Sequence, residues 1–256
     1  MDEAVVPTNE VFYLRYLLDT SYENDDERIE ALKANIKWRL TEGNKIVTSA
    51  HEAIQAACSP ESATWNNLPI QQAAPHADRI NKYLTSVNCI TTSLPSTSDL
   101  VYCVRAGKID DKALMSSVSV EEMIDFFLYA KEVHSAVANM RSLEKDSLIQ
   151  VITCNDLSGV KLVGGSSDFR SALSLSSKKA SQLYPSLSGK TLMLNLPTLL
   201  GALVKLFTPL FPESVRKRIR FQSGPLKNVD NLMQIAESGV ARSEFVKQME
   251  MLAYGE

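Results

Sequence analysis

The residues 189–191 (Gly-Lys-Thr) are the types with which a phosphate-binding loop cradles a nucleotide. Such a loop needs another glycine five positions before Gly189, and position 184 is a tyrosine. Gly159 and Gly164 have the correct step, but Gly165 stands where the lysine belongs. The sequence therefore predicts no nucleotide-binding loop at either place.

Other catalytic patterns are equally weak. The serine-rich stretch 166–188 contains no histidine that could serve as a neighbouring base, so we interpret it as a solvated helix face. The acidic pairs at 110–111 and 121–122 are typical of a turn and a helix start. Four cysteines and three histidines are too dispersed for a metal site. We expect no enzyme, no metal and no cofactor.

An apolar segment over residues 192–211 has a different character. Asn195, Pro197, Lys205 and Pro209 interrupt it, so it is too short for a membrane span. Its apolar residues surround most of a helix predicted over 197–208, which indicates a helix that is buried on several sides or that contacts lipid. A central core helix is the alternative. A basic run, 216–220, follows, and such runs are most often a solvated face.

Composition limits the class of protein. The chain has 256 residues, of which 45% are hydrophobic and 22% charged, so it is globular with room for one large domain or one domain and a smaller companion. A formal charge of −3 gives no general attraction to nucleic acid. The N-terminus lacks the pattern of a signal peptide, and the scattered cysteines fit a reducing compartment, so we expect a cytoplasmic protein.

The secondary structure predicted from the sequence falls into two parts, a helical lobe with a linker over 1–99 and an α/β domain over 100–256. In the lobe we expect helices over 11–18, 25–40, 49–58 and 76–87, with loops between and after the last two. The second should bury the stripe Ile29, Leu32, Ile36 and Leu40. In the domain, strands near 100–106, 148–154, 190–196 and 219–222 alternate with helices over 120–140, 166–183 and 197–207. Helices over 225–237 and 242–252 follow. This order predicts a mostly parallel sheet with crossover helices.

The run 184–221 resembles the CRAL-TRIO lipid-binding family in the order and spacing of several residues. The matching positions are Tyr184, Pro185, Gly189, Lys190, Asn195, Pro197, Pro209 and Ile219. Residues 101–110 and 155–159 are similar to the opening strand and the Asp-Leu-x-Gly turn of that family. Residues 14–17 and 37–39 are similar to its helical N-terminal module, whereas 49–99 match poorly.

The resemblance implies that the sheet floors an apolar lipid cavity and that helix 197–208 is a movable gate. The ligand-binding residues it implies are Val151, Thr153, Tyr184, Ser186, Leu199, Leu203, Phe207, Leu210, Phe211 and Arg218. Basic residues near an anionic leaflet contribute roughly 1 kcal/mol each. We therefore expect Lys205, Arg216, Lys217 and Arg220 to dock the mouth of the cavity on anionic membranes.

The inositol headgroup motif of the family is degraded. Phosphatidylinositol-transferring members have Arg, Glu, Thr and Lys where this sequence has Thr20, Ser186, Val215 and Arg218. Thr153 matches a hydroxyl placed near choline in such proteins, but Val151 replaces its serine partner. We expect a protein, peripheral on membranes, that binds one apolar or amphipathic lipid and exchanges it between membranes, without efficient transfer of phosphatidylinositol. The alternative is a non-transferring lipid-sensing or scaffold module that regulates a signalling or trafficking partner, and an enzyme is the least favoured reading.

Overall fold

The computed structural model describes residues 5–7, 9–57, 67–160, 164–197, 204, 217–227, 229–236 and 238–255. The first part contains helices α1 (Glu10–Leu18), α2 (Asp25–Leu40), α3 (Asn44–Ala57), α4 (Asn67–Gln72) and α5 (Ala77–Ile80). The second contains β1 (Cys89–Ser93), β2 (Leu100–Arg105), α6 (Asp111–Met115), α7 (Val120–Lys145), β3 (Val151–Asp156), α8 (Ser167–Leu183) and β4 (Ser188–Leu194). The last described elements are β5 (Ile219–Gln222), α11 (Met233–Ala236) and α12 (Val240–Tyr254).

The described strands form one five-stranded sheet in the order β1-β2-β3-β4-β5. Strand β1 pairs antiparallel with β2, and the remaining neighbours pair parallel. Helix α7 connects β2 to β3 and α8 connects β3 to β4, as parallel neighbours require. The predicted α/β class with a mostly parallel sheet and crossover helices is confirmed.

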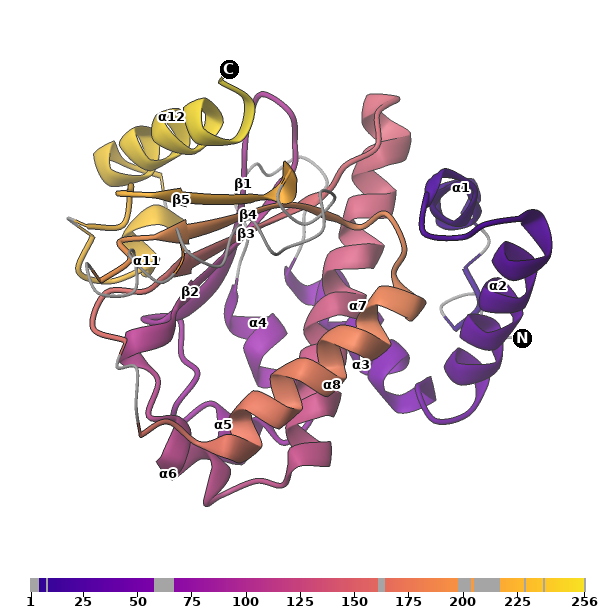
Figure 1. Cartoon of the computed structure of the whole chain (residues 1–256), viewed down its shortest axis with the longest axis horizontal. Coiled ribbons are helices and arrows are strands. Elements are labelled where there is room, and N and C mark those ends of the chain that lie inside the picture. Colours follow the sequence, from indigo (N-terminus) through magenta and orange to yellow (C-terminus); the bar gives the residue numbers. More distant parts are fainter. Residues whose placement is uncertain are drawn as a thin grey trace.

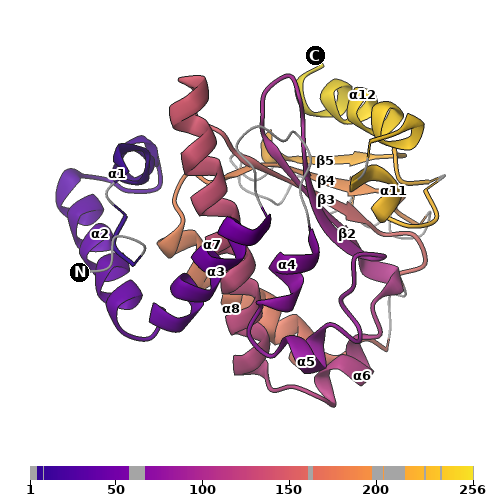
Figure 2. The ribbon, with the colours of Figure 1, turned by 180° about the vertical axis from the view of Figure 1, so that it is seen from behind.

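The elements form layers around this sheet (Figure 1). Helices α11 and α12 cover one face, and α7 and α8 lie on the other (Figure 2). Helices α1 and α2 lie beyond α7, on the side away from the sheet (Figure 1). Two hydrophobic clusters correspond to the two faces, one around α3, α7 and α8 and the other between the sheet and α12.

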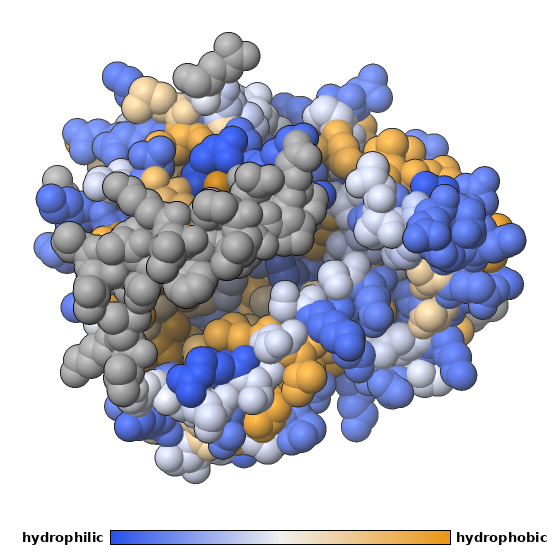
Figure 3. Space-filling view, in the orientation of Figure 1, coloured by the Kyte–Doolittle hydropathy of each residue, from blue (hydrophilic) through white to orange (hydrophobic). Residues whose placement is uncertain are grey.

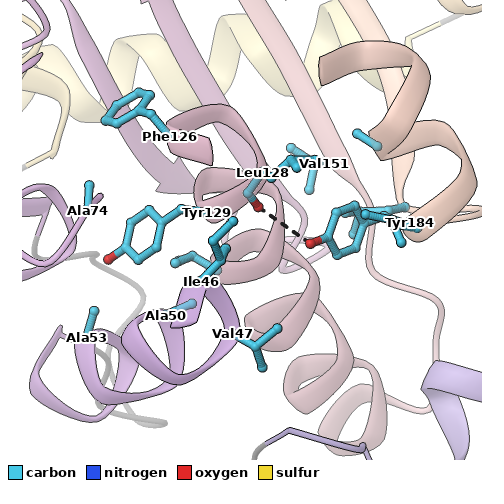
Figure 4. Packing of buried hydrophobic residues seen from close by; sticks show 14 of the residues in the cluster. Ile46, Val47, Ala50, Ala53, Ala74, Phe126, Leu128, Tyr129, Val151 and Tyr184 are labelled. Carbon is cyan, nitrogen blue, oxygen red and sulfur yellow. Dashed lines mark hydrogen bonds between the residues drawn. The ribbon is translucent and has the colours of Figure 1, made fainter. Parts of the chain in front are cut away.

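Helix α7 is the central helix of the larger cluster. Ser119 and Glu122 form a capping box at its start, and Asp146, with φ 49°, ends it in the left-handed conformation. It packs against α3 through Tyr129 and against the turn after α8, where the Tyr184 hydroxyl donates to the Leu128 carbonyl at 3.5 Å (Figure 4). Because it is buried on most sides, α7 holds the N-terminal helices and the sheet together.

Buried polar contacts attach the N-terminal helices to the sheet domain. Arg15 of α1 donates to the Asn139 side chain at 2.7 Å and to the carbonyls of Ile149 and Ser186 at 2.7 and 2.9 Å. Asn35 of α2 donates to the Leu183 carbonyl at 2.5 Å. Each contact satisfies a polar group that would otherwise be costly to bury.

Several predicted details are wrong. The stripe Ile29, Leu32, Ile36 and Leu40 is not the buried face of α2, because Ile29 and Leu40 are 47% and 46% exposed, whereas Asn35, Trp38 and Arg39 are buried. The helix expected over 76–87 is only α5, and the expected loop after it contains β1. The helix expected over 225–237 is the short α11.

Candidate functional site

The two faces of the sheet differ in burial. Strand residues that face α11 and α12 are at most 2% exposed: Val101, Cys103, Ile152, Cys154, Leu192 and Leu194. The residues that alternate with them are only half-buried: Tyr102, Val104, Thr153, Asn155, Thr191 and Met193. Successive strand residues point to opposite faces. The half-buried set therefore forms one continuous face, on the side of α7 and α8.

The strand register arranges this face in two rows. The first runs through Tyr102, Thr153, Thr191 and Ile219. The second runs through Val104, Asn155, Met193 and Phe221. We call these eight residues the floor. The floor carries apolar side chains and threonine methyl groups beside hydroxyl and amide groups. It therefore suits a ligand that is mostly apolar but carries a polar group.

A pocket adjoins the floor beneath β1 and β2, between α4 and α7. Its lining includes Asn67, Gln71, Thr91, Tyr102 and His134 among mainly apolar side chains. Its internal volume of about 40 Å³ is enough for a few water molecules and far too small for a lipid. The pocket is therefore a small recess at one end of the floor, mainly apolar but with a few polar groups.

The polar walls of this recess carry no charge near neutral pH. The Thr91 hydroxyl and His134 Nε2 are 2.8 Å apart, and the His134 and Tyr102 rings meet edge to face at 5.0 Å. Burial, with a smaller effect of Lys131, lowers the pKa of His134 to about 3. The Cys89 thiol donates to the Tyr102 hydroxyl at 3.1 Å, and burial raises its pKa to about 11.

The space-filling view shows the molecular surface hollowed between the strands and α8 (Figure 3). Two apolar side chains of α8, Leu173 and Leu175, are 43% and 52% exposed. Among the described residues, no group of three or more histidine, cysteine or acidic side chains could hold a metal ion. None of the helices in the described part of the chain is long and apolar enough to cross a membrane.

A CRAL/TRIO domain model matches residues 92–236, which is more than half of the chain. The chain belongs to the CRAL/TRIO family. This membership implies a lipophilic ligand, and the family is generally non-enzymatic. No curated protein matches the sequence. The crystal structure of Sfh5 is similar with a TM-score of 0.53 and 16% identity, over 89% of this chain and 67% of that one.

The CRAL/TRIO resemblance identified one floor residue, Thr153. Val151 precedes it on the same strand but is 1% exposed beneath the helices. Tyr184 is 5% exposed and packs against α7 (Figure 4). Ser186 lies beside α1, where its amide donates to the Asp19 carboxylate at 2.9 Å. The structure therefore separates Tyr184 and Ser186 from the floor.

The proposed gate and mouth fall mainly on undescribed parts of the CRAL/TRIO domain. Leu199, Leu203, Phe207, Leu210, Phe211, Lys205, Val215 and Arg216 lie outside the described residues. Lys217, Arg218 and Arg220 are described and exposed. Arg220 pairs with Leu192 across the sheet, so it lies on the face opposite the floor.

The N-terminal arginine of the headgroup motif is also absent from its expected place. Thr20, the aligned position, is exposed, and the arginine that contacts Ser186 is Arg15. Arg15 already has three acceptors, and burial lowers its pKa to about 10. It is therefore a structural link between α1 and the sheet domain.

Seven of the eight floor residues were not predicted as ligand-binding residues from the sequence. They are Tyr102, Val104, Asn155, Thr191, Met193, Ile219 and Phe221. In β2, the bulky Tyr102 between the smaller apolar residues Val101 and Cys103 was a usable signal. Only the register between strands shows that these positions form rows.

Proposed function

We propose that this CRAL/TRIO chain binds one amphipathic lipid over the floor and exchanges it between membranes. The observation that supports this most directly is the contrast between the two faces of one sheet. The face under α11 and α12 is sealed, whereas the eight floor residues are only half-buried. A sheet face with half-buried apolar groups supports the proposal of a ligand site there.

The energetics of lipid extraction require an enclosed site. A diacyl lipid has about 30 methylenes, and at roughly 0.8 kcal/mol each their exposure to water would cost on the order of 20–25 kcal/mol. A bare floor would bury one side of such a ligand only. We therefore propose that the helix predicted over 197–208 covers the ligand and acts as a gate.

The sheet topology supports a gate on this side. Strands β4 and β5 are parallel neighbours, and connections between parallel neighbours are right-handed in nearly all proteins. The connections through α7 and α8 lie on the floor side of the sheet. We therefore propose that the connection from β4 to β5 is right-handed as well and passes over the same side. Leu203→Asp is therefore expected to abolish lipid transfer between vesicles while thermal unfolding is unchanged, and unchanged transfer would exclude this gate.

We further propose that the basic cluster, Lys205 with Arg216, Lys217 and Arg220, contacts anionic membranes while the gate opens. The exposure of Lys217 is compatible with this role, whereas Arg220 is exposed on the face opposite the floor. Each charge near the surface contributes roughly 1 kcal/mol, which suits transient docking and not permanent anchoring.

Native mass spectrometry of protein purified under mild conditions tests the proposed function. One lipid molecule bound per chain supports ligand binding, and vesicle assays then test whether the lipid is exchanged. A protein that stays empty, and takes up no lipid from vesicles, would favour a scaffold or sensing module.

A further inference from the structure

Lys131 lies on the side of α7 that faces the sheet and α8. It is four residues after Phe127 and three before His134, so the three side chains share one face of the helix. The Phe127 ring meets Phe169 of α8 at 6.1 Å, and the His134 ring meets Tyr102 of the floor at 5.0 Å. Lys131 therefore lies between α8 and the floor, at the end where the small recess begins.

The ammonium group of Lys131 lacks a counter-ion among the residues that the structure describes. The residue is half-buried, and no described side chain or carbonyl forms a hydrogen bond or ion pair with it. Burial lowers its pKa, and no neighbouring carboxylate acts in the opposite direction. The next residue, Glu132, shows the usual solution for a buried charge, since Arg39 binds it through two hydrogen bonds. A largely buried ammonium group is costly unless an anion lies close to it.

The surroundings of Lys131 favour one type of partner. His134 is uncharged near neutral pH, so it adds no second positive charge beside Lys131. Thr153 and Thr191 place two hydroxyl groups in the first row of the floor, and hydroxyl groups can donate hydrogen bonds to an anion. A single lysine acts as a point charge and balances one negative charge.

We infer that Lys131 binds the acidic group of the lipophilic ligand and that this ligand is a long-chain lipid with one negative charge, a carboxylate or a phosphodiester. This inference rests on the proposed function, because it needs the ligand to lie over the floor. The acyl chain then extends along the apolar residues of the floor, and the acidic group stays at the end beside the recess.

Calorimetric titration of the delipidated protein with three probes of equal chain length tests the inference. The probes are dodecanoate, dodecyl methyl phosphate and dodecan-1-ol, so the first two distinguish carboxylate from phosphodiester and the third lacks charge. We expect at least tenfold tighter binding of one acid than of the alcohol. In Lys131→Met that preference should vanish while affinity for the alcohol is kept, and Lys131→Arg should retain most of it.

Two controls keep the outcomes distinct. Lys145→Met removes an exposed lysine of the same helix and should leave the preference intact. Lys131→Met should unfold at the same or a higher temperature than the unchanged protein, whereas a lysine with a structural role would lower it. Equal binding of all three probes, or a preference that survives in Lys131→Met, would overturn the inference and leave the proposed function standing. Failure of every probe to bind would contradict the proposed function itself.

Discussion

The guanidinium of Arg39 binds the carboxylate of Glu132 through two hydrogen bonds of 2.8 and 2.6 Å, with both side chains only 2% exposed. The pair joins α2 to α7, the helix that also faces the floor. Burial alone would raise the pKa of Glu132, but Arg39 and His51 outweigh it and hold that pKa at about 2. This buried ion pair thus adds to the hydrogen bonds of Arg15 and Asn35 that attach the N-terminal helices to the sheet domain.

Removal of one member of this pair should be strongly destabilising. Arg39→Met leaves the Glu132 carboxylate buried without its partner, and we expect a loss of about 3–5 kcal/mol in the free energy of unfolding. Urea denaturation measures this loss. The exposed pair of Lys33 and Glu30 is a matched control, and Lys33→Met should cost less than about 1 kcal/mol. Similar small effects in both variants would show that the buried pair contributes little.

The stability of the protein should fall as the pH is lowered from 6.5 toward 4.5. The pKa of His134 lies at about 3 in the folded protein against an ordinary value of 6.5, so the unfolded chain binds a proton that the folded chain rejects. The contribution of His134 to the free energy of unfolding is complete above pH 6.5. Below that pH it decreases by up to about 1.4 kcal/mol per pH unit. The depressed pKa of Glu132 reduces the free energy of unfolding only when the pH falls below about 4.5.

Denaturation curves of the unchanged protein and of His134→Gln, recorded from pH 7.5 to 4.5, separate the two effects. The variant should show a flatter profile between pH 6.5 and 4.5. An identical slope in both proteins would assign the pH dependence to other groups.

A bulky side chain on the floor should block the ligand without unfolding the protein. Thr153→Trp occupies the centre of the first row, and we expect at least a tenfold weaker binding of lipid. Gln222→Trp adds the same side chain on the opposite face of the exposed edge strand β5 and should bind normally. Lipid binding is measured by calorimetry, which the added tryptophan does not disturb. Equal binding by both variants would show that the floor is not the site.

The basic cluster should make membrane association depend on charge. Co-sedimentation with liposomes is expected to rise with phosphatidylserine content and to fall with added salt, because such attraction is screened within about 8 Å at physiological ionic strength. Replacing Arg216, Lys217 and Arg220 with Gln should remove this dependence, while Arg218 is retained since the family resemblance places it near the ligand. Association that changes with neither salt nor lipid charge would show that these residues are an ordinary solvated surface and do not dock on membranes.

The order of strands and helices was predictable because it follows from local patterns. The apolar run 148–154 and the long helix over 120–140 both correspond to described elements, β3 and α7. Strand β1 was missed because its residues Cys89–Ser93 are rich in hydroxyl groups. Thr91 finds its partners in Asn67 and His134, and such distant contacts leave no local signal in the sequence.

The buried face of α2 shows a second limit of prediction from apolar spacing. Apolar spacing favoured Ile29, Leu32, Ile36 and Leu40, but the helix packs through Asn35, Trp38 and Arg39. A buried arginine or asparagine is stable only where an acceptor meets it, and the acceptors belong to α7 and to the end of α8. Lys131 was not predicted for the same reason, because the neighbouring residues in the sequence do not indicate that this lysine is half-buried.

The cysteines of the sheet give the protein an internal probe of its own opening. Cys103 and Cys154 are register partners on neighbouring strands, are fully buried as free thiols, and face α12. A thiol reacts with alkylating reagents only when it is exposed as thiolate. The rate of their alkylation in native buffer therefore reports how often α12 detaches from the sheet or the whole protein unfolds. Motions confined to the opposite face would leave both thiols unlabelled.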